Sequence, residues 1–218
     1  MKTYQDLLDV GADESARMSF VLAAIDAHKR SAAYAVARDA ELYDRRLNVT
    51  IRSYQRLLYT VSGQAVEDPF RANHKIASGF FPRFVNQQNQ FLLGNGVTLT
   101  DQNNKAKLGR GFDRQLQKLG HAAIVGGVAF GFWNLDHLDV FRLTEFVPLY
   151  DENNGALMAG IRFWQVSKTK PLRATLYELD GYTDYIKTDE KPMSVLKEKR
   201  SYILHIATSE IDGTEIYD

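Results

Sequence analysis

Residues 73–99 read NHKIASGFFPRFVNQQNQFLLGNGVTL, and this stretch decides more of the fold than any other part of the chain. Apolar side chains at Ile76, Phe80 and Phe84 recur every four residues, which predicts an amphipathic helix of about five turns from Asn73. Pro82 fits this helix without a kink only if it lies near an end. Gly94 is well placed to end the helix as a left-handed residue. The apolar run after it, residues 97–100, then predicts a strand.

The chain before this stretch is predicted to be mostly helical. Apolar residues at steps of three and four predict one long helix, or two in line, from Asp13 to Leu47. Ser31 is a candidate N-cap for a second helix. The alanine-rich stripe of this segment suits packing on the rest of the domain, with a coiled coil as the alternative. Short runs on either side of Ser62-Gly63 predict a small hairpin within residues 56–67.

The chain after residue 126 is predicted to be β-rich. Helical periodicity continues over Lys105–Val125 and ends at Gly126-Gly127. Strands are then predicted at Val128–Asn134, Asp139–Thr144, Phe146–Tyr150, Met158–Ser167, Leu172–Leu179, Tyr182–Lys187 and Ser201–Thr208. We therefore expect an α+β fold, with long helices in residues 13–125 and a mostly antiparallel β meander in residues 127–218. The sequence has no internal repeat or low-complexity linker, so one compact unit over residues 1–218 is expected.

Composition limits the classes of function. The chain has 218 residues, of which 44% are hydrophobic, enough to bury a substantial core. Lys+Arg and Asp+Glu number 27 each, and this neutral balance argues against a stand-alone nucleic-acid binder. The absence of cysteine excludes disulfides, thiol nucleophiles and Cys-ligated metal sites. No signal peptide or long apolar run is visible, so we expect a chain that is neither exported nor membrane-spanning.

The residues that suggest chemistry are few. Asp136, His137 and Asp139 could serve acid–base or metal chemistry, but they fall in a predicted turn, where such residues are usually solvated. Gly109-Arg110-Gly111 and Gly126-Gly127 lack the Lys-Ser/Thr ending of a phosphate-binding loop. The other histidines are scattered along the chain: His28, His74, His121 and His205. We therefore expect no enzymatic activity, catalytic residue, metal or cofactor.

Residues 45–56, RRLNVTIRSYQR, interleave basic and aromatic side chains. Such a segment could contact phosphates. A solvated face or a subunit interface is the favoured interpretation.

Several segments resemble, in the same order, the portal proteins of tailed bacteriophages, in the branch common in phages of Gram-positive hosts. Residues 73–95 are similar to the family's Asn/His-Lys-Ile opening, long helix and Leu-Leu-Gly-Asn ending. Residues 120–133, GHAAIVGGVAFGFW, resemble its step from helix through glycine to an aromatic strand, and residues 145–151, EFVPLYD, its Pro-hydrophobic-Tyr-Asp step. Residues 159–164 and 174–178 resemble its next two strands. The residues that carry the match are Asn73, Lys75, Leu92, Leu93, Gly94, Asn95, Gly127, Pro148, Tyr150 and Asp151.

The resemblance implies a structural role without bond-making chemistry. It implies a ring of about twelve subunits at one capsid vertex, through which double-stranded DNA is packaged and ejected. The implied partners are further copies of the chain, the terminase large subunit, capsid or scaffolding proteins, head-completion proteins and the passing DNA, with no membrane. The implied location is the virion, and the host cytoplasm during assembly.

The match spans residues 45–190 and corresponds to the outer, wing portion of a portal. The stem, clip and channel-loop sequences are missing, so we expect the chain to be the first part of a longer polypeptide. The alternative is a small cytoplasmic α+β enzyme or ligand-binding domain unrelated to capsids.

Overall fold

The computed structural model of the protein describes residues 2–100, 105, 108–109, 111–134, 137–189, 191–202, 206–208 and 215–217. The fold is α+β, as predicted. One compact unit was expected, and the structure divides the chain into two. Unit 1 consists of residues 1–31 and 145–218, and unit 2 of residues 32–144. The second unit is thus an insertion in the sequence of the first.

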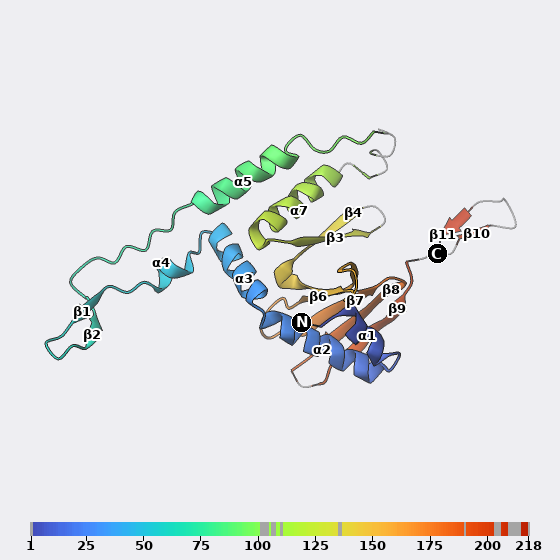
Figure 1. Cartoon of the computed structure of the whole chain (residues 1–218), viewed down its shortest axis with the longest axis horizontal. Helices are drawn as coiled ribbons and strands as arrows, with labels where there is room; N and C mark the ends of the chain where they lie inside the picture. The colour runs from blue at the N-terminus through green and yellow to red at the C-terminus, as the bar shows by residue number, and fades with distance from the viewer. Residues whose placement is uncertain are drawn as a thin grey trace. The chain divides into compact units, whose positions relative to one another are not determined.

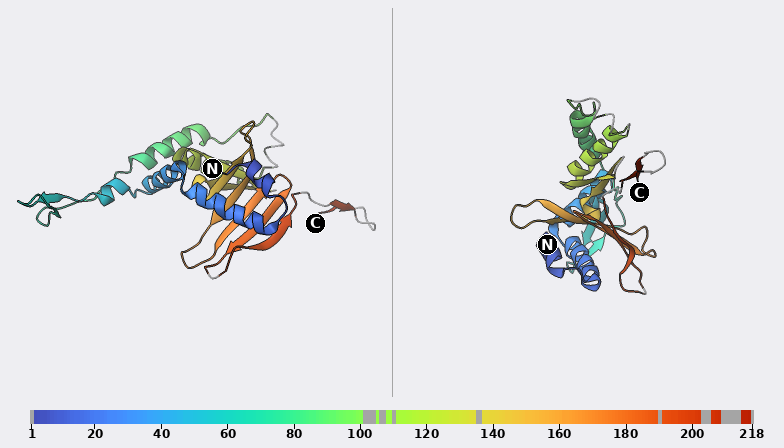
Figure 2. Two further views of the ribbon diagram at one scale, coloured as in Figure 1. Left: turned by 60° about the horizontal axis from the view of Figure 1, so that its bottom comes forward. Right: turned by 90° about the vertical axis from the view of Figure 1, so that its right-hand side faces the viewer.

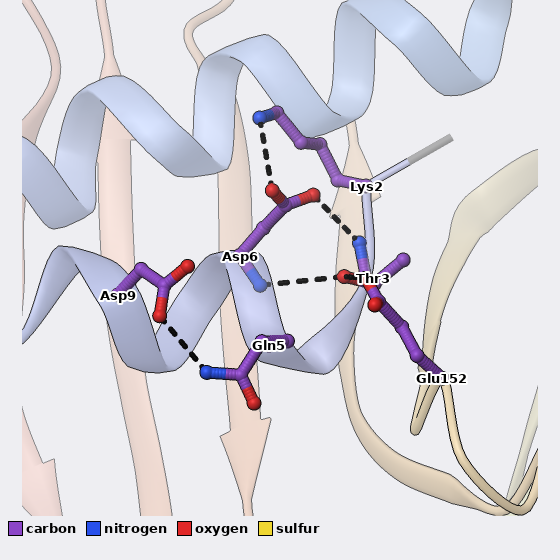
Figure 3. A network of polar contacts seen from close by, with 6 residues as sticks. All are labelled: Lys2, Thr3, Gln5, Asp6, Asp9 and Glu152. Atoms are coloured by element: carbon purple, nitrogen blue, oxygen red, sulfur yellow. Dashed lines mark hydrogen bonds and ion pairs between the residues drawn. The ribbon is translucent and has the colours of Figure 1, made fainter.

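Unit 1 begins with α1 (Tyr4–Val10) and α2 (Glu14–Lys29). A capping box starts α1, because Thr3 Oγ1 accepts from Asp6 N at 3.3 Å and Asp6 Oδ2 accepts from Thr3 N at 3.0 Å (Figure 3). Asp13 caps α2 by accepting from Ala16 N at 3.1 Å, which confirms the predicted helix start. The short helix α1 was not predicted, although its Thr-x-x-Asp signal is present in the sequence.

The rest of unit 1 is an antiparallel five-stranded meander. Its strands are β5 (Phe146–Tyr150), β6 (Leu157–Trp164), β7 (Leu172–Glu178), β8 (Gly181–Lys187) and β9 (Ser194–Arg200), adjacent in that order. Figure 2 shows α2 lying across one face of this sheet.

The core of unit 1 lies between that face and α2. Val147, Ile161 and Leu176 are register neighbours on three adjacent strands, and all are at most 1% exposed. Period-two alternation places them on the same face. The helix contributes the buried residues Phe20, Val21, Ala24 and Ile25.

One strand was predicted in the wrong place. Residues 201–202 of the expected strand Ser201–Thr208 are not in a strand, and residues 203–205 lie outside the described residues. Strand β9 ends at Arg200, and the short β10 (Ile206–Thr208) pairs with β11 (Glu215–Tyr217). The sequence of β9, SVLKEKR, carries four charges and is almost wholly exposed. Charged side chains protect a sheet edge from further pairing, and they also remove the hydrophobic alternation on which the prediction relied.

The described part of unit 2 consists of helices and the two hairpins β1–β2 and β3–β4. In chain order its elements are α3 (Ala32–Asp44), α4 (Val49–Ser53), β1 (Leu57–Tyr59), β2 (Ala65–Glu67), α5 (Phe80–Leu93), α7 (Phe112–Gly126), β3 (Ala129–Asn134) and β4 (His137–Arg142). A 3-10 turn, η1 (Leu143–Glu145), leads into β5. Figure 1 shows α5 beside α7, and the β3–β4 hairpin packed next to α7. The hairpin predicted within residues 56–67 is confirmed as β1–β2.

Several boundaries in unit 2 differ from the prediction. The helix expected from Asn73 begins only at Phe80, so Pro82 is its third residue, where its missing N–H costs no intrahelical bond. The helix predicted from Lys105 has its continuous part, α7, from Phe112. The predicted strand at residues 97–100 is absent from the described structure. Val97 N instead donates to Asp113 Oδ1 at 3.2 Å.

The left-handed glycine was also assigned to the wrong position. Gly94 does end α5, but with the right-handed φ of −61°, while Gly96 has φ +71°. Gly94 N still donates to Gln90 O at 2.8 Å, so the helical turn continues through it. The carbonyl of Leu93 accepts from Gly96 N at 3.0 Å and from Gln117 Nε2 of α7 at 2.9 Å. A tertiary contact therefore satisfies the helix end that a left-handed Gly94 was expected to satisfy.

The first prediction concerns Gly160 in β6. A Cβ at this position would collide with the ring of Phe146, which is 5% exposed and cannot move into solvent. Gly160→Ala should therefore lower the free energy of unfolding by about 1–3 kcal/mol through overpacking. Thermal and urea unfolding measure this, with Gly126→Ala as the control because a Cβ there meets open space. Equal stability of the two variants would contradict the packing.

The second prediction concerns pH. The Thr3 N–H, followed by the charge of Lys2, lowers the pKa of Asp6 below 3.8. The stabilisation from this carboxylate is then present above about pH 4 and is lost as the pH falls through its lowered pKa. Solvent screening limits the loss in Asp6→Asn to about 0.5 kcal/mol at neutral pH. The unfolding curves of the wild type and of Asp6→Asn, measured between about pH 3 and 7, should converge at the acid end.

Candidate subunit interface

The most unusual surface of the described structure is the segment of residues 45–84, which we call the arm. It contains α4, the β1–β2 hairpin and the connection into α5. Twelve of the 22 large hydrophobic side chains that are exposed in the described residues lie in it. These twelve are Leu47, Val49, Tyr54, Leu57, Leu58, Tyr59, Val61, Val66, Phe70, Ile76, Phe80 and Phe84. Apolar surface concentrated in this way marks an interaction site.

Local chemistry gives the arm its conformation. Asn48 caps α4 by accepting from Ile51 N at 3.0 Å. Gly63, at φ +81°, allows the turn of the hairpin. Beyond the hairpin, Asp68 accepts from Phe70 N at 2.9 Å across Pro69. Each of these contacts is local, so the arm does not depend on a buried core of its own.

The base of the arm is held by Asn73 and Lys75, two residues on which the predicted portal resemblance rests. Asn73 Nδ2 donates to Tyr54 O at 3.3 Å, and Lys75 Nζ donates to Arg52 O at 2.8 Å. These hydrogen bonds tie the returning chain to the end of α4 and explain why residues 73–79 are not helical. The helix predicted for residues 73–79 is therefore wrong.

The hairpin itself has little to stabilise it. All six residues of β1 and β2 are exposed. A lone two-stranded hairpin is marginally stable in water, and stability requires packing of its apolar side chains against another surface. The exposed Leu57, Leu58 and Val66 therefore indicate that the arm is built to be covered by a partner.

A second candidate is a pocket of about 350 Å³ between α3, α7 and β4. Four of its six ionisable side chains are paired with one another. His121 Nε2 lies 3.0 Å from Asp44 Oδ2, and Arg142 Nη1 lies 3.1 Å from Glu41 Oε2. Thr144 Oγ1 also donates to Glu41, at 2.5 Å. These contacts cross-link α3 to α7 and to the β4 end, so the pocket has a structural explanation.

A third candidate is a groove of about 360 Å³ in unit 1, lined by the start of α2 and by β8 and β9. Arg17 Nη2 lies 2.5 Å from Glu178 Oε2, and Lys199 Nζ lies 2.6 Å from Asp180 Oδ1 and 3.2 Å from Glu178 Oε2. The hydrogen bond from Lys199 lowers the pKa of Asp180. Burial raises the pKa of Tyr185, against an opposing hydrogen bond from Arg17.

This network neutralises both bases of the groove. Two acids remain on its rim, Glu14 and Glu198, which are exposed and form no ion pair within the described part of the chain. The groove therefore presents unpaired carboxylates to solvent.

The residues predicted to suggest chemistry do not form a site. His137 Nε2 lies 3.7 Å from Asp139 Oδ1 in β4, and both side chains are more than a third exposed. Asp136 lies outside the described residues. Among those that are described, no three His, Cys, Asp or Glu side chains are arranged to hold a metal ion. His28 is buried against the ring of Phe163, at 6.2 Å between ring centroids, which is a core contact.

The residues that carry the family match are also not gathered into one place. Asn73 and Lys75 lie at the base of the arm, and Leu92, Leu93, Gly94 and Asn95 surround the end of α5. Gly127 ends α7 with φ +80°. In unit 1, Pro148 and Tyr150 belong to the edge strand β5, and Asp151 begins the turn after it. Their shared property is position at element ends and edges, where backbone geometry is constrained.

The third prediction tests the loop after α5. Gly96 has a positive φ, and a Cβ there would lie 2.5 Å from Asp113 Oδ2, the group that accepts from Val97 N and pairs with Lys105 at 3.0 Å. Gly96→Ala should cost about 1–2 kcal/mol of stability from the left-handed backbone alone. Gly63→Ala is the matched control, since it has a similar φ but no neighbour within 4 Å. A smaller loss in Gly96→Ala than in the control would contradict the placement of Asp113.

No described helix combines the length and apolar character needed to cross a bilayer. No protein-family model matches the chain, and no curated protein matches it. The arm is therefore the candidate functional site on its geometry alone.

Proposed function

We propose that this chain is the wing part of a phage portal protein, a ring-forming component of one capsid vertex through which double-stranded DNA enters and leaves. The observation that carries the proposal is the ordered match of five segments over residues 45–190 to the portal family. Each segment alone is short, but their order and spacing along one chain are specific.

The positions of these segments in the fold support the proposal. The Leu-Leu-Gly-Asn ending coincides with the end of α5, and Gly127 separates α7 from the aromatic strand β3. The Pro-hydrophobic-Tyr step is strand β5, and residues 159–164 and 174–178 lie within β6 and β7.

The arm also supports a role in assembly. A ring is built from heterologous contacts, in which one surface of a subunit binds a different surface of its neighbour. Such a contact requires an exposed apolar surface on each subunit, and the arm supplies one. The proposed partners are further copies of the chain, the terminase large subunit, capsid or scaffolding proteins and head-completion proteins, with DNA passing through the ring.

The proposal assigns no bond-making chemistry to this chain. Hydrolysis of ATP belongs to the terminase on this view, and the sequence has no Gly-Lys-Ser/Thr phosphate loop. The neutral balance of 27 basic and 27 acidic residues gives no net electrostatic attraction to duplex DNA.

The fourth prediction is the state of assembly. A longer polypeptide that contains this chain and a stem should form rings, visible by negative-stain electron microscopy and as a single large species by light scattering. The 218-residue chain by itself should associate only weakly and should form no rings. A longer polypeptide that stays monomeric at every concentration and salt condition would contradict the proposal.

An ATPase assay on the same preparations distinguishes the portal proposal from the alternative of a small enzyme. Under the portal proposal, phosphate release from ATP should remain at background in the wild type and in His137→Ala. Turnover that is lost in His137→Ala would instead support a small enzyme with its site near β4.

A further inference from the structure

We propose that the arm of one copy docks on the acidic face of unit 1 of a second copy, with the groove beside α2 as its receptor. This inference rests on the proposed function, because it names the two surfaces that meet in the ring. It is argued from charge, from the chemistry of the arm and from the unpaired acids of the groove.

The two units of the chain carry opposite charge. Residues 32–144 contain 14 basic and 9 acidic side chains, a net charge of +5. Residues 1–31 and 145–218 together contain 13 basic and 18 acidic side chains, a net charge of −5. The neutral chain is therefore divided between a basic and an acidic unit. Complementary potentials of this kind favour specific encounter between the two surfaces.

Within the two units, the arm is the basic segment and the segment that spans α1 and α2 is the acidic one. The arm, residues 45–84, holds seven basic and two acidic residues. Residues 4–29, which span α1 and α2, hold five acidic and two basic residues. Of the two bases, Arg17 is paired with Glu178 at 2.5 Å, and Lys29 Nζ lies over the ring of Phe163. Asp6 is paired with Lys2 at 3.6 Å, and the segment as a whole carries a net charge of −3.

Individual residues suit the contact. Arg52 and Arg56 are exposed on the arm, and within the described residues neither guanidinium forms an ion pair. Glu14 and Glu198 stand on the rim of the groove, and Val195 and Tyr185 line it. Arginine pairs with carboxylate through two parallel hydrogen bonds, and the two arginines equal the two carboxylates in number.

The apolar side chains of the arm favour a protein over DNA as the occupant. Basic and aromatic side chains alone would also suit a nucleic acid, through phosphate contacts and base stacking. The arm, however, exposes the aliphatic residues Leu57, Leu58, Val61, Val66 and Ile76. Aliphatic side chains gain nothing from phosphates and gain most when another protein removes them from water.

The proposed contact is heterologous. The arm and the groove are different surfaces, so each copy that joins leaves one arm and one groove free. Association of the 218-residue chain should therefore be weak, should grow with concentration and should weaken with added salt.

The test is sedimentation equilibrium of the 218-residue chain. Two double variants are compared with the wild type: Arg52→Glu/Arg56→Glu in the arm, and Glu14→Arg/Glu198→Arg on the groove. Each double variant alone should self-associate with a dissociation constant about tenfold higher than that of the wild type. Lys168→Glu/Lys170→Glu is the matched control, since it reverses two exposed charges in the β6–β7 turn and should associate as the wild type does.

A mixture of the two double variants tests directly whether the arm of one copy binds the groove of another. The arm variant keeps an intact groove and the groove variant keeps an intact arm, so an equimolar mixture should recover association as a complex of the two. All substituted positions are exposed, and circular dichroism melting curves check that the variants fold.

Three results would overturn the inference. The first is a wild-type chain that does not associate at any concentration, and the second is association that survives both double variants. The third is a gel shift of duplex DNA that the arm variant abolishes while self-association is unchanged, which would make the arm a nucleic-acid surface.

The same arm variant distinguishes this inference from the proposed function. Introduced into the longer polypeptide, Arg52→Glu/Arg56→Glu should prevent or weaken ring formation in electron micrographs. Unchanged rings would overturn the docking surface and leave the portal proposal standing, whereas a wild-type polypeptide without rings would count against the portal proposal itself.

Discussion

The burial of α2 against the sheet β5–β9 is the interaction on which the rest of the structure depends. It brings together the start of the chain and its second half, because α2 ends at Lys29 and β5 begins at Phe146. The row Val147, Ile161 and Leu176 is buried, and α2, which comes from the other end of the sequence, packs against β5 and β6, two of the strands that carry it. This contact makes unit 1 discontinuous and turns the intervening residues into an inserted unit.

The inserted unit has a different balance of forces. Its inner part is held by ordinary packing of α5 on α7, where Gly120 permits close approach: a Cβ at that position would lie 2.6 Å from Asn89 Oδ1 and from Leu93 Cδ1. Its outer part, the arm, is held by caps and backbone hydrogen bonds and exposes most of its apolar side chains. Burial thus stabilises one part, while the other part keeps apolar surface available for a partner.

The arm contains apolar residues whose exposure could not be predicted from the sequence. Ile76, Phe80 and Phe84 have helical spacing, and this spacing led to the prediction of a buried helix face. The structure leaves all three exposed and keeps Ile76 outside the helix. Spacing shows which side chains can share a face, but it does not show whether that face meets the core of the same chain or the surface of another. Asn73 and Lys75 illustrate the same limit, since their hydrogen-bond partners lie about twenty residues earlier in the chain.

The sequence by itself determined the α+β class, the β1–β2 hairpin and most strands of the meander, and it offered a break between two helices at Ser31 as one of two alternatives. These features follow from local signals, namely caps, turn residues and alternation, which act over a few residues. Tertiary structure decided the division into two units, the start of α5 at Phe80, the satisfaction of Leu93 O by Gln117, and the charged edge strand β9. Each of these depends on groups far apart in the chain, whose contacts outweigh local propensity and leave no pattern within a short window of sequence.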